Sequence, residues 1–128
     1  MNAPGDASAV CGGERFAQGV IEIVGPDLER SLAFYLSLGF ELLRRTGNFA
    51  VVAWDGQRLF LAEDPHAPVA PRWANLRIMV EDVEVVWRRA LALGITPLHP
   101  IDDRFYGLRD FKLADPAGFE LRFAQALA

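Results

Sequence analysis

The sequence predicts an α+β fold built from two tandem βαβββ modules, whose curved mixed sheets each carry a helix on the outer face. Three observations lead to this fold class. Two helical segments with matching ends lie 55 residues apart, one strand-like stretch precedes each of them, and three strand-like stretches follow each. Internal similarity at a fixed spacing is the sequence signature of a duplicated structural unit.

The two helical segments form the clearest part of the repeat. Asp27 precedes the first and Asp82 the second, and an aspartate at this position accepts hydrogen bonds from the free amides of a helix start. Gly39 and Gly94 follow where a helix ends on a left-handed residue. The predicted apolar stripe consists of Leu28, Leu32, Tyr35 and Leu36 in the first segment and of Val83, Trp87, Ala90 and Leu91 in the second.

The strand-like stretches alternate apolar and polar residues, which is typical of strands with one buried face. Thr46-Gly47, Asp55-Gly56 and Asp115-Pro-Ala-Gly118 supply turn residues between them. The predicted strands are 19–24, 40–44, 48–54 and 57–62 in module one, and 74–80, 96–98, 108–113 and 119–123 in module two.

The chain divides into an arm and one domain. Residues 1–15 are expected to form an N-terminal arm, either disordered or reaching across to a second subunit, with Cys11 as a spectator on it. A single domain is expected over 16–126. Within it, module one spans 16–63, a proline-rich linker spans 64–72, and module two spans 73–126.

Composition excludes several classes of function. A chain of 128 residues with 52% hydrophobic residues can form one globular domain. The net charge of −4 and the lack of a basic run argue against nucleic-acid binding. No apolar run approaches the ~20 residues of a membrane span, and no secretory signal is evident. A single cysteine suits a reducing compartment, so a cytoplasmic protein without membrane or nucleic-acid partners is expected.

Several stretches within residues 17–125 resemble the vicinal oxygen chelate superfamily of glyoxalases and ring-cleaving dioxygenases, and most of all its bleomycin resistance proteins. They are Asp27-Leu-Glu-Arg-Ser-Leu-Ala-Phe-Tyr, Leu-Gly-Phe40, Tyr106-Gly-Leu-Arg-Asp-Phe111 and Asp115-Pro-Ala-Gly118. The first two are shared across the superfamily, whereas the Tyr-Gly-x-Arg-x-Phe stretch is typical of the resistance branch. The resemblance implies the duplicated fold predicted above.

The resemblance also locates the four positions at which superfamily enzymes bind a divalent metal. Here they hold Val20, Phe60, Asn75 and Arg122. Valine and phenylalanine have no donor atom and arginine is cationic, so no metal and no other cofactor is expected. His66 and His99 both neighbour proline and are interpreted as surface loop residues. A displaced site using Glu22 and Glu120 is the alternative.

Strand alternation predicts which residues share the sheet face away from the helices. That face holds Val20, Glu22, Val24, Arg58, Phe60, Asn75, Arg77, Met79, Glu120 and Arg122, whereas Ile21, Ile23, Leu76, Ile78, Leu121 and Phe123 pack against the helices. Half of the first set is charged. These charges either pair with one another across a wet cleft or contact a ligand.

The resemblance implies a binding protein without catalytic activity that sequesters a small planar ligand, such as a bleomycin-type antibiotic, in a cleft between the subunits of a homodimer. Such a protein confers antibiotic resistance. The candidate ligand-binding residues are Tyr106, Phe49, Trp54, Phe60, Arg77, Glu22, Asn75 and Arg122. Arg44 and Arg77 replace aromatic residues of the resistance family, and an arginine-rich cleft suits an anionic or zwitterionic ligand better than a cationic drug.

Two other functions remain open at this point. One is a glyoxalase- or dioxygenase-like enzyme with a non-standard site, including a metal-free catalyst that uses Glu22 or Glu120 as acid or base. The other is a module whose cleft serves as a site for a protein partner.

Overall fold

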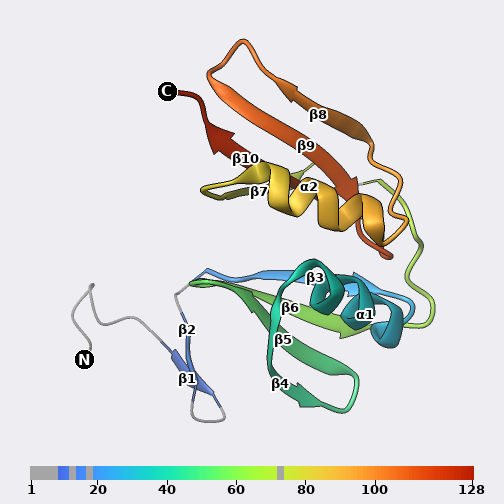
Figure 1. Cartoon of the computed structure of the whole chain (residues 1–128). Coiled ribbons are helices and arrows are strands. Elements are labelled where there is room, and N and C mark those ends of the chain that lie inside the picture. Colours follow the sequence, from blue (N-terminus) through green and yellow to red (C-terminus); the bar gives the residue numbers. More distant parts are fainter. Residues whose placement is uncertain (1–8, 12–13, 17–18, 72–73) are drawn as a thin grey trace.

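The computed structural model describes residues 9–11, 14–16, 19–71 and 74–128, and it confirms the two consecutive βαβββ modules (Figure 1). Module one comprises β3 (Ile21–Gly25), α1 (Leu28–Leu38), β4 (Glu41–Thr46), β5 (Phe49–Trp54) and β6 (Gln57–Glu63). Module two comprises β7 (Asn75–Met79), α2 (Val83–Ala92), β8 (His99–Asp103), β9 (Leu108–Ala114) and β10 (Glu120–Ala126).

Each module forms a four-stranded mixed sheet with the same topology. The strand order is β3-β6-β5-β4 in module one and β7-β10-β9-β8 in module two. In both sheets the first strand pairs in parallel with the last, and the remaining pairs are antiparallel. Glu22 lies opposite Phe60 in the first sheet, and Arg77 lies opposite Arg122 in the second. The two sequence repeats therefore correspond to two sheets with the same strand order and the same pairing of first and last strands.

The predicted caps define both helices. The Asp27 side chain accepts a hydrogen bond from the amide of Arg30, and that of Asp82 accepts one from the amide of Glu84. Gly39 (φ 124°) and Gly94 (φ 77°) adopt the positive φ that ends each helix. With 11 and 10 residues, neither helix of the described segments is long and apolar enough to cross a membrane.

The apolar stripes differ from the prediction at one equivalent position in each helix. Leu36 and Leu91 are exposed, whereas Leu38 and Val86 are buried in the core. A helix packed on a sheet buries a face centred on one line, and position i+8 of the predicted stripe lies on the shoulder of that face. The same deviation in both modules follows from their common packing.

Strand β8 is the one strand whose predicted position is wrong. The sequence placed it at 96–98, but the strand runs from His99 to Asp103 and includes Pro100. Because β8 is the edge strand of its sheet, a proline without an amide hydrogen is tolerated there. Its pairing with β9 is irregular between His99 and Asp102. His99 therefore belongs to the sheet edge and not to a loop.

Most of the predicted N-terminal arm, residues 1–15, lies outside the described residues. Ala9–Cys11 (β1) pairs antiparallel with Glu14–Phe16 (β2), and this two-stranded pairing was not predicted from the sequence.

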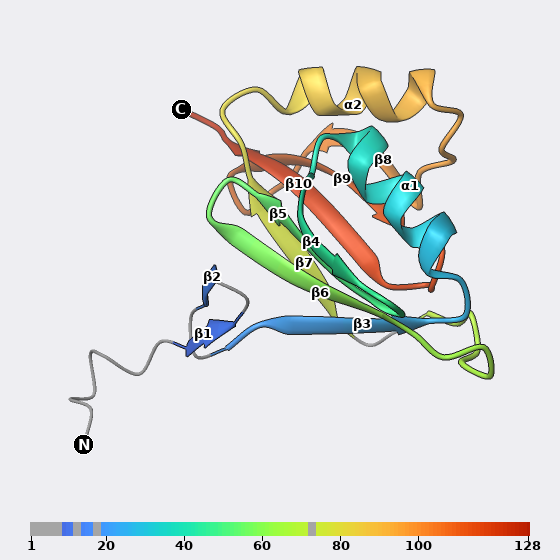
Figure 2. The same cartoon turned by 90° about the horizontal axis from the view of Figure 1, so that it is seen from below.

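The helix-covered faces of the two sheets meet in one core. Ile23, Leu61, Ile78 and Phe123 belong to a single hydrophobic cluster, as alternation predicted. Trp54 of module one contacts Phe123 of module two, with ring centroids 5.1 Å apart. Figure 2 shows both helices on the same side of the molecule, where Arg89 of α2 donates to the carbonyl of Leu38 at the end of α1 (2.6 Å).

A buried hydrogen bond also joins the modules. The Tyr35 hydroxyl of α1 donates to the Asp115 carboxylate of module two at 2.6 Å, and Asp115 further accepts from the amides of Ala117 and Phe119. Burial raises the pKa of Tyr35 well above its usual value, and the neighbouring carboxylate adds to this. Tyr35 therefore stays a neutral donor at physiological pH.

The linker closes over the last turn of module two. Gly118 has φ 90°, and a side chain there would collide with the backbone of Ala70. The Asp-Pro-Ala-Gly turn thus needs its glycine for conformation and for space.

Candidate functional site

Each sheet has a second face that no helix covers, and these helix-free faces contain most of the predicted site. We call the face formed by Glu22, Arg44, Phe49, Arg58 and Phe60 the module-one face. We call the face formed by Asn75, Arg77, Asp110, Lys112, Glu120 and Arg122 the module-two face. Strand register assigns these residues to their faces. The contacts that join the modules come from the opposite, helix-covered faces.

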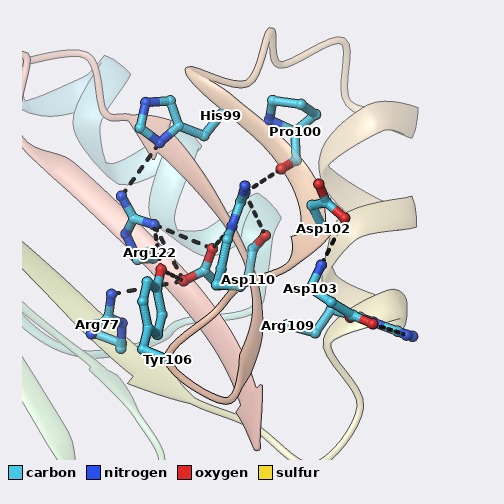
Figure 3. A network of polar contacts seen from close by, with 10 residues as sticks. Arg77, His99, Pro100, Asp102, Asp103, Tyr106, Arg109, Asp110 and Arg122 are labelled. Atoms are coloured by element: carbon cyan, nitrogen blue, oxygen red, sulfur yellow. Dashed lines mark hydrogen bonds and ion pairs between the residues drawn. The ribbon is translucent and has the colours of Figure 1, made fainter. Parts of the chain in front are cut away.

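A buried carboxylate organises the module-two face (Figure 3). Asp110 on β9 is fully buried (0% exposed). Its Oδ1 accepts from Arg104 Nε at 2.7 Å, its Oδ2 accepts from the Tyr106 hydroxyl at 2.6 Å, and Arg122 Nη1 lies 3.2 Å from both oxygens. Arg77 Nη2 completes the cluster at 3.7 Å from Oδ2. One carboxylate thus stands among three guanidinium groups.

The cluster keeps Asp110 ionised. Burial by itself raises the pKa of the Asp110 carboxyl, because it disfavours the charged form. Hydrogen bonds from Tyr106, Arg104 and Arg122, together with the charge of Arg122, outweigh burial and hold this pKa below its usual value. A buried charge of this kind is tolerated because it is paired and hydrogen-bonded.

Tyr106 and Arg77 form a stacked pair at the open side of this cluster. The guanidinium of Arg77 lies over the Tyr106 ring, 5.4 Å from its centroid, and Figure 3 shows the two side chains next to each other. Tyr106 is 43% exposed, and its neighbour Phe105 at the hairpin tip is fully exposed. Tyr106 is therefore accessible, as expected, but a cation already covers part of its ring.

The charges around His99 show which sign prevails at this edge of the module-two face. Its Nδ1 lies 3.4 Å from Arg122 Nη2. Desolvation lowers the pKa of His99 most, and the charges of Lys112, Arg122 and Arg104 lower it further, whereas Glu120 raises it. Cations outnumber anions around this imidazole, so the field at this edge of the module-two face is positive.

The module-one face carries two aromatic rings beside its three charged side chains. The rings of Phe49 and Phe60 meet edge to face, with centroids 5.0 Å apart. Arg44 of β4 lies over the Phe49 ring at 5.8 Å from its centroid. Both helix-free faces thus carry an arginine over an aromatic ring, although the two pairs come from different strands and loops.

Trp54, a candidate ligand-binding residue, lies on the helix-covered side of its sheet and not on the module-one face. Its ring packs against Phe40 (5.3 Å) and Phe123 (5.1 Å) on the helix-covered side. Phe49 and Trp54 are five residues apart on β5, so alternation directs them to opposite faces. Trp54 nevertheless lines a cavity of about 230 Å³ between the modules, together with Asp55, Gly56, Gln57, Arg77, Ile78 and Met79.

The remaining predicted residues are placed as follows. Asn75 and Glu22 are exposed on their faces. Glu120 pairs with Lys112 at 2.9 Å, and Arg122 pairs with Asp110. Both side chains are thus paired within the chain, which is one of the two alternatives considered for the charges of this face.

No group of three or more His, Cys, Asp or Glu residues arranged for a metal occurs in the part of the chain that the structure describes. Of the four positions at which superfamily enzymes bind a metal, two hold Val20 and Phe60, whose side chains have no donor atom. His66, the other histidine, is exposed in the linker.

Asp110 and Arg104 are missing from the residues that the sequence singled out. Asp110 belongs to the Tyr106-Gly-Leu-Arg-Asp-Phe111 stretch, and it lies two residues before Lys112, the register partner of Arg122. Alternation along β9, and not only along the first and last strands, would have placed Asp110 beside Arg122. Arg104 follows the irregular strand β8, where alternation gives no guidance.

The fold has clear relatives. The family model of the glyoxalase/bleomycin resistance protein/dioxygenase superfamily matches residues 17–123. The chain belongs to this superfamily. Comparison with curated proteins finds no match.

Among solved structures, this chain is similar to the bleomycin resistance determinant encoded on transposon Tn5. The two are 21% identical, with a TM-score of 0.74, and the match covers 87% of this chain and 98% of that one. It also resembles a bleomycin-binding protein complexed with bleomycin (22% identity, TM-score 0.72, coverage 86% and 98%). A superfamily protein from Alicyclobacillus acidocaldarius is similar to the same degree (23% identity, TM-score 0.73, coverage 87% and 93%). At these identities the likeness establishes the fold.

Proposed function

We propose that this protein binds a small planar ligand without transforming it, in a cleft between the module-one face of one copy and the module-two face of a second copy. In this proposal the protein is a homodimer with two equivalent clefts. The placement of the helix-free faces carries the proposal. The two modules of one chain use their helix-covered faces to form their common core, so both helix-free faces are left to a second copy.

The side chains on the two faces support a planar ligand. Phe49 and Phe60 offer aromatic surface on the module-one face, and Tyr106 offers it on the module-two face. Aromatic rings in offset or edge-to-face contact gain ~0.5–1.5 kcal/mol beyond area burial. A second copy would place the module-one face of one chain opposite the module-two face of the other and so bring these rings to the two sides of one cleft.

The chemistry of the faces supports binding over catalysis. Val20, Phe60, Asn75 and Arg122 do not form a ligand set for a catalytic metal. Glu120, one of the two carboxylates considered as an acid or base, pairs with Lys112. A solved relative of similar fold binds bleomycin, and sequestration of an antibiotic is the corresponding role for this chain.

The test combines assembly with binding. Light scattering at micromolar concentration should give about 28 kDa, twice the 14.2 kDa of one chain. Calorimetric titration with bleomycin and with neutral naphthamide should then show one ligand per chain for whichever of the two binds, and mass spectrometry should recover that ligand unchanged. A monomer of about 14 kDa that binds neither probe, or a chemically altered ligand, would contradict the proposal.

A further inference from the structure

We propose that the ligand of this cleft carries an oxyanion, with an aromatic carboxylate as the best match, and that Arg77 receives the carboxylate through two parallel N–H···O hydrogen bonds. This inference rests on the proposed cleft and adds the chemical class of its ligand. It also assigns distinct tasks to three residues: Arg77 binds the anion, Tyr106 supports Arg77, and Asp110 positions the surrounding guanidinium groups.

Arg77 has donors to spare. Its side chain is 40% exposed, and within the described residues its guanidinium makes no hydrogen bond. It forms an ion pair with Asp110 at 3.7 Å and stacks on the Tyr106 ring. Stacking uses the flat face of a guanidinium and leaves the N–H groups at its edge available. Arg77 is thus held in place while its hydrogen-bonding edge stays open.

Asp110 cannot accept hydrogen bonds from the free N–H groups of Arg77, because its acceptor sites are already occupied. A carboxylate offers about four lone-pair sites. The Tyr106 hydroxyl, Arg104 Nε and Arg122 Nη1, which contacts both oxygens, occupy the Asp110 carboxylate. Arg77 is therefore left at ion-pair distance, and a second carboxylate is what its fork lacks.

Charge on the module-two face points the same way. Arg77, Lys112 and Arg122 contribute three positive charges to this face, and Asp110 and Glu120 contribute two negative ones, so its net charge is +1. Among the described residues, the Nε of Arg122 is also buried without a hydrogen-bond partner, so the guanidinium cluster is not saturated by its own aspartate. A cationic ligand here would meet like charge, whereas an oxyanion would complete the set.

Among oxyanions, a carboxylate conjugated to a ring fits best. It is flat and matches the guanidinium fork in two parallel hydrogen bonds. Its ring would then extend in the plane of the Arg77 edge toward the aromatic module-one face of the second copy. Phosphate and sulfonate share the charge but not the planarity.

The test uses naphthalene probes of equal size and different charge, titrated calorimetrically into the native dimer near neutral pH. Naphthoate should bind about tenfold or more tightly than naphthamide, because charge-assisted hydrogen bonds are the stronger ones. Naphthylmethylamine, a cation, should bind most weakly. Naphthalenesulfonate and naphthyl phosphate should lie between naphthoate and the amide.

Variants then locate the anion. Arg77→Gln should lower naphthoate affinity about tenfold or more and change naphthamide affinity less than about twofold. Arg77→Lys keeps the charge but not the fork, so it should lose part of that affinity. Arg45→Gln is the matched control, because Arg45 is also 40% exposed but pairs with Glu29 on the helix-covered side; its naphthoate affinity should equal wild type.

Each outcome is informative. If the amide or the amine binds as tightly as naphthoate, the ligand class is wrong while the proposed cleft stands. Preference for naphthoate that survives Arg77→Gln would remove Arg77 from its role. If no probe of any charge binds, the proposed function itself fails. Tyr106→Phe should keep naphthoate binding and Tyr106→Leu should lose most of it; equal affinities would contradict the supporting role of the ring.

Discussion

The two modules share one topology, yet their helix-free faces have opposite characters. At equivalent positions of the first and last strands, module one holds Glu22 and Phe60, whereas module two holds Arg77 and Arg122. On the helix-covered side the equivalent residues Ile23 and Ile78 are both buried in the shared core. The repeat is thus retained where it builds the core and has diverged on the faces where a ligand is proposed to bind.

Divergence has different structural consequences on the two faces. The module-one face is built from side chains that gain stability by ordinary apolar burial, such as the Phe49–Phe60 pair. The module-two face depends on a fully buried charge, and removing one member of such a cluster leaves the others uncompensated. The module-two face is therefore expected to be the more fragile of the two, and the predictions below test this difference.

The largest effect is expected at Asp110. Asp110→Ala leaves three guanidinium groups without their common carboxylate and should lower the free energy of unfolding by ~3–5 kcal/mol. Asp103→Ala in the same hairpin is the control. Asp103 pairs with Arg109 at 2.6 Å but is exposed, so solvent screens the pair and the loss should be far smaller. Urea denaturation measures both, and equal losses would show that Asp110 is not the organising residue of its face.

An intermediate effect distinguishes two tyrosine–aspartate hydrogen bonds of equal length. Tyr35→Phe removes the hydroxyl that donates to buried Asp115 and should cost ~1–3 kcal/mol. Tyr106→Phe removes a bond of the same 2.6 Å length, but Tyr106 is 43% exposed and two arginines still bond Asp110. Its cost should stay below ~1 kcal/mol. The thermal unfolding midpoints of the two variants measure these costs, and Tyr35→Phe should have the lower midpoint. A lower midpoint for Tyr106→Phe would contradict the assignment of partners.

The smallest effect is a dependence on pH. Because the pKa of Asp110 in the folded chain lies below its usual value of 3.8, its charge adds stability above pH 3.8. That contribution is lost as pH falls through the lower, folded value. The difference in unfolding free energy between wild type and Asp110→Asn should thus be constant between about pH 5 and 7 and shrink below about pH 4. A difference that stays constant into acid would show that Asp110 is not ionised in the folded protein.

Fold and site were not equally predictable from the sequence. The repeat, the caps at Asp27 and Asp82, and most core-facing residues follow from local periodicity, and the structure confirms them, with Leu36 and Leu91 as exceptions. Strand β8 was predicted at 96–98 instead of His99–Asp103 because Pro100 is tolerated only where a strand lies at a sheet edge, and the sheet order is not visible in the sequence.

The site was harder to predict because it depends on contacts between distant strands and on a loop. The Asp110 cluster joins β7, β9, β10 and the β8–β9 loop, and its partners follow only from register. Trp54 was named as a ligand-binding candidate without a sheet face, and counting along β5 would have placed it on the helix-covered side. The ligand-binding roles of Phe49, Phe60, Arg77 and Tyr106 stay predictions that require a ligand.

The most direct test of the central claim, a cleft shared by two copies, is a mixed dimer. One chain carries Phe49→Ala on the module-one face, and the other carries Tyr106→Ala on the module-two face. Each pure variant should lose about tenfold in affinity at both of its clefts for the tightest naphthalene probe. In the mixed dimer one cleft combines both defects and the other combines two intact faces. We predict one probe bound per mixed dimer at wild-type affinity. A mixed dimer without any wild-type-affinity site would show that the site lies within a single copy and would contradict the shared cleft.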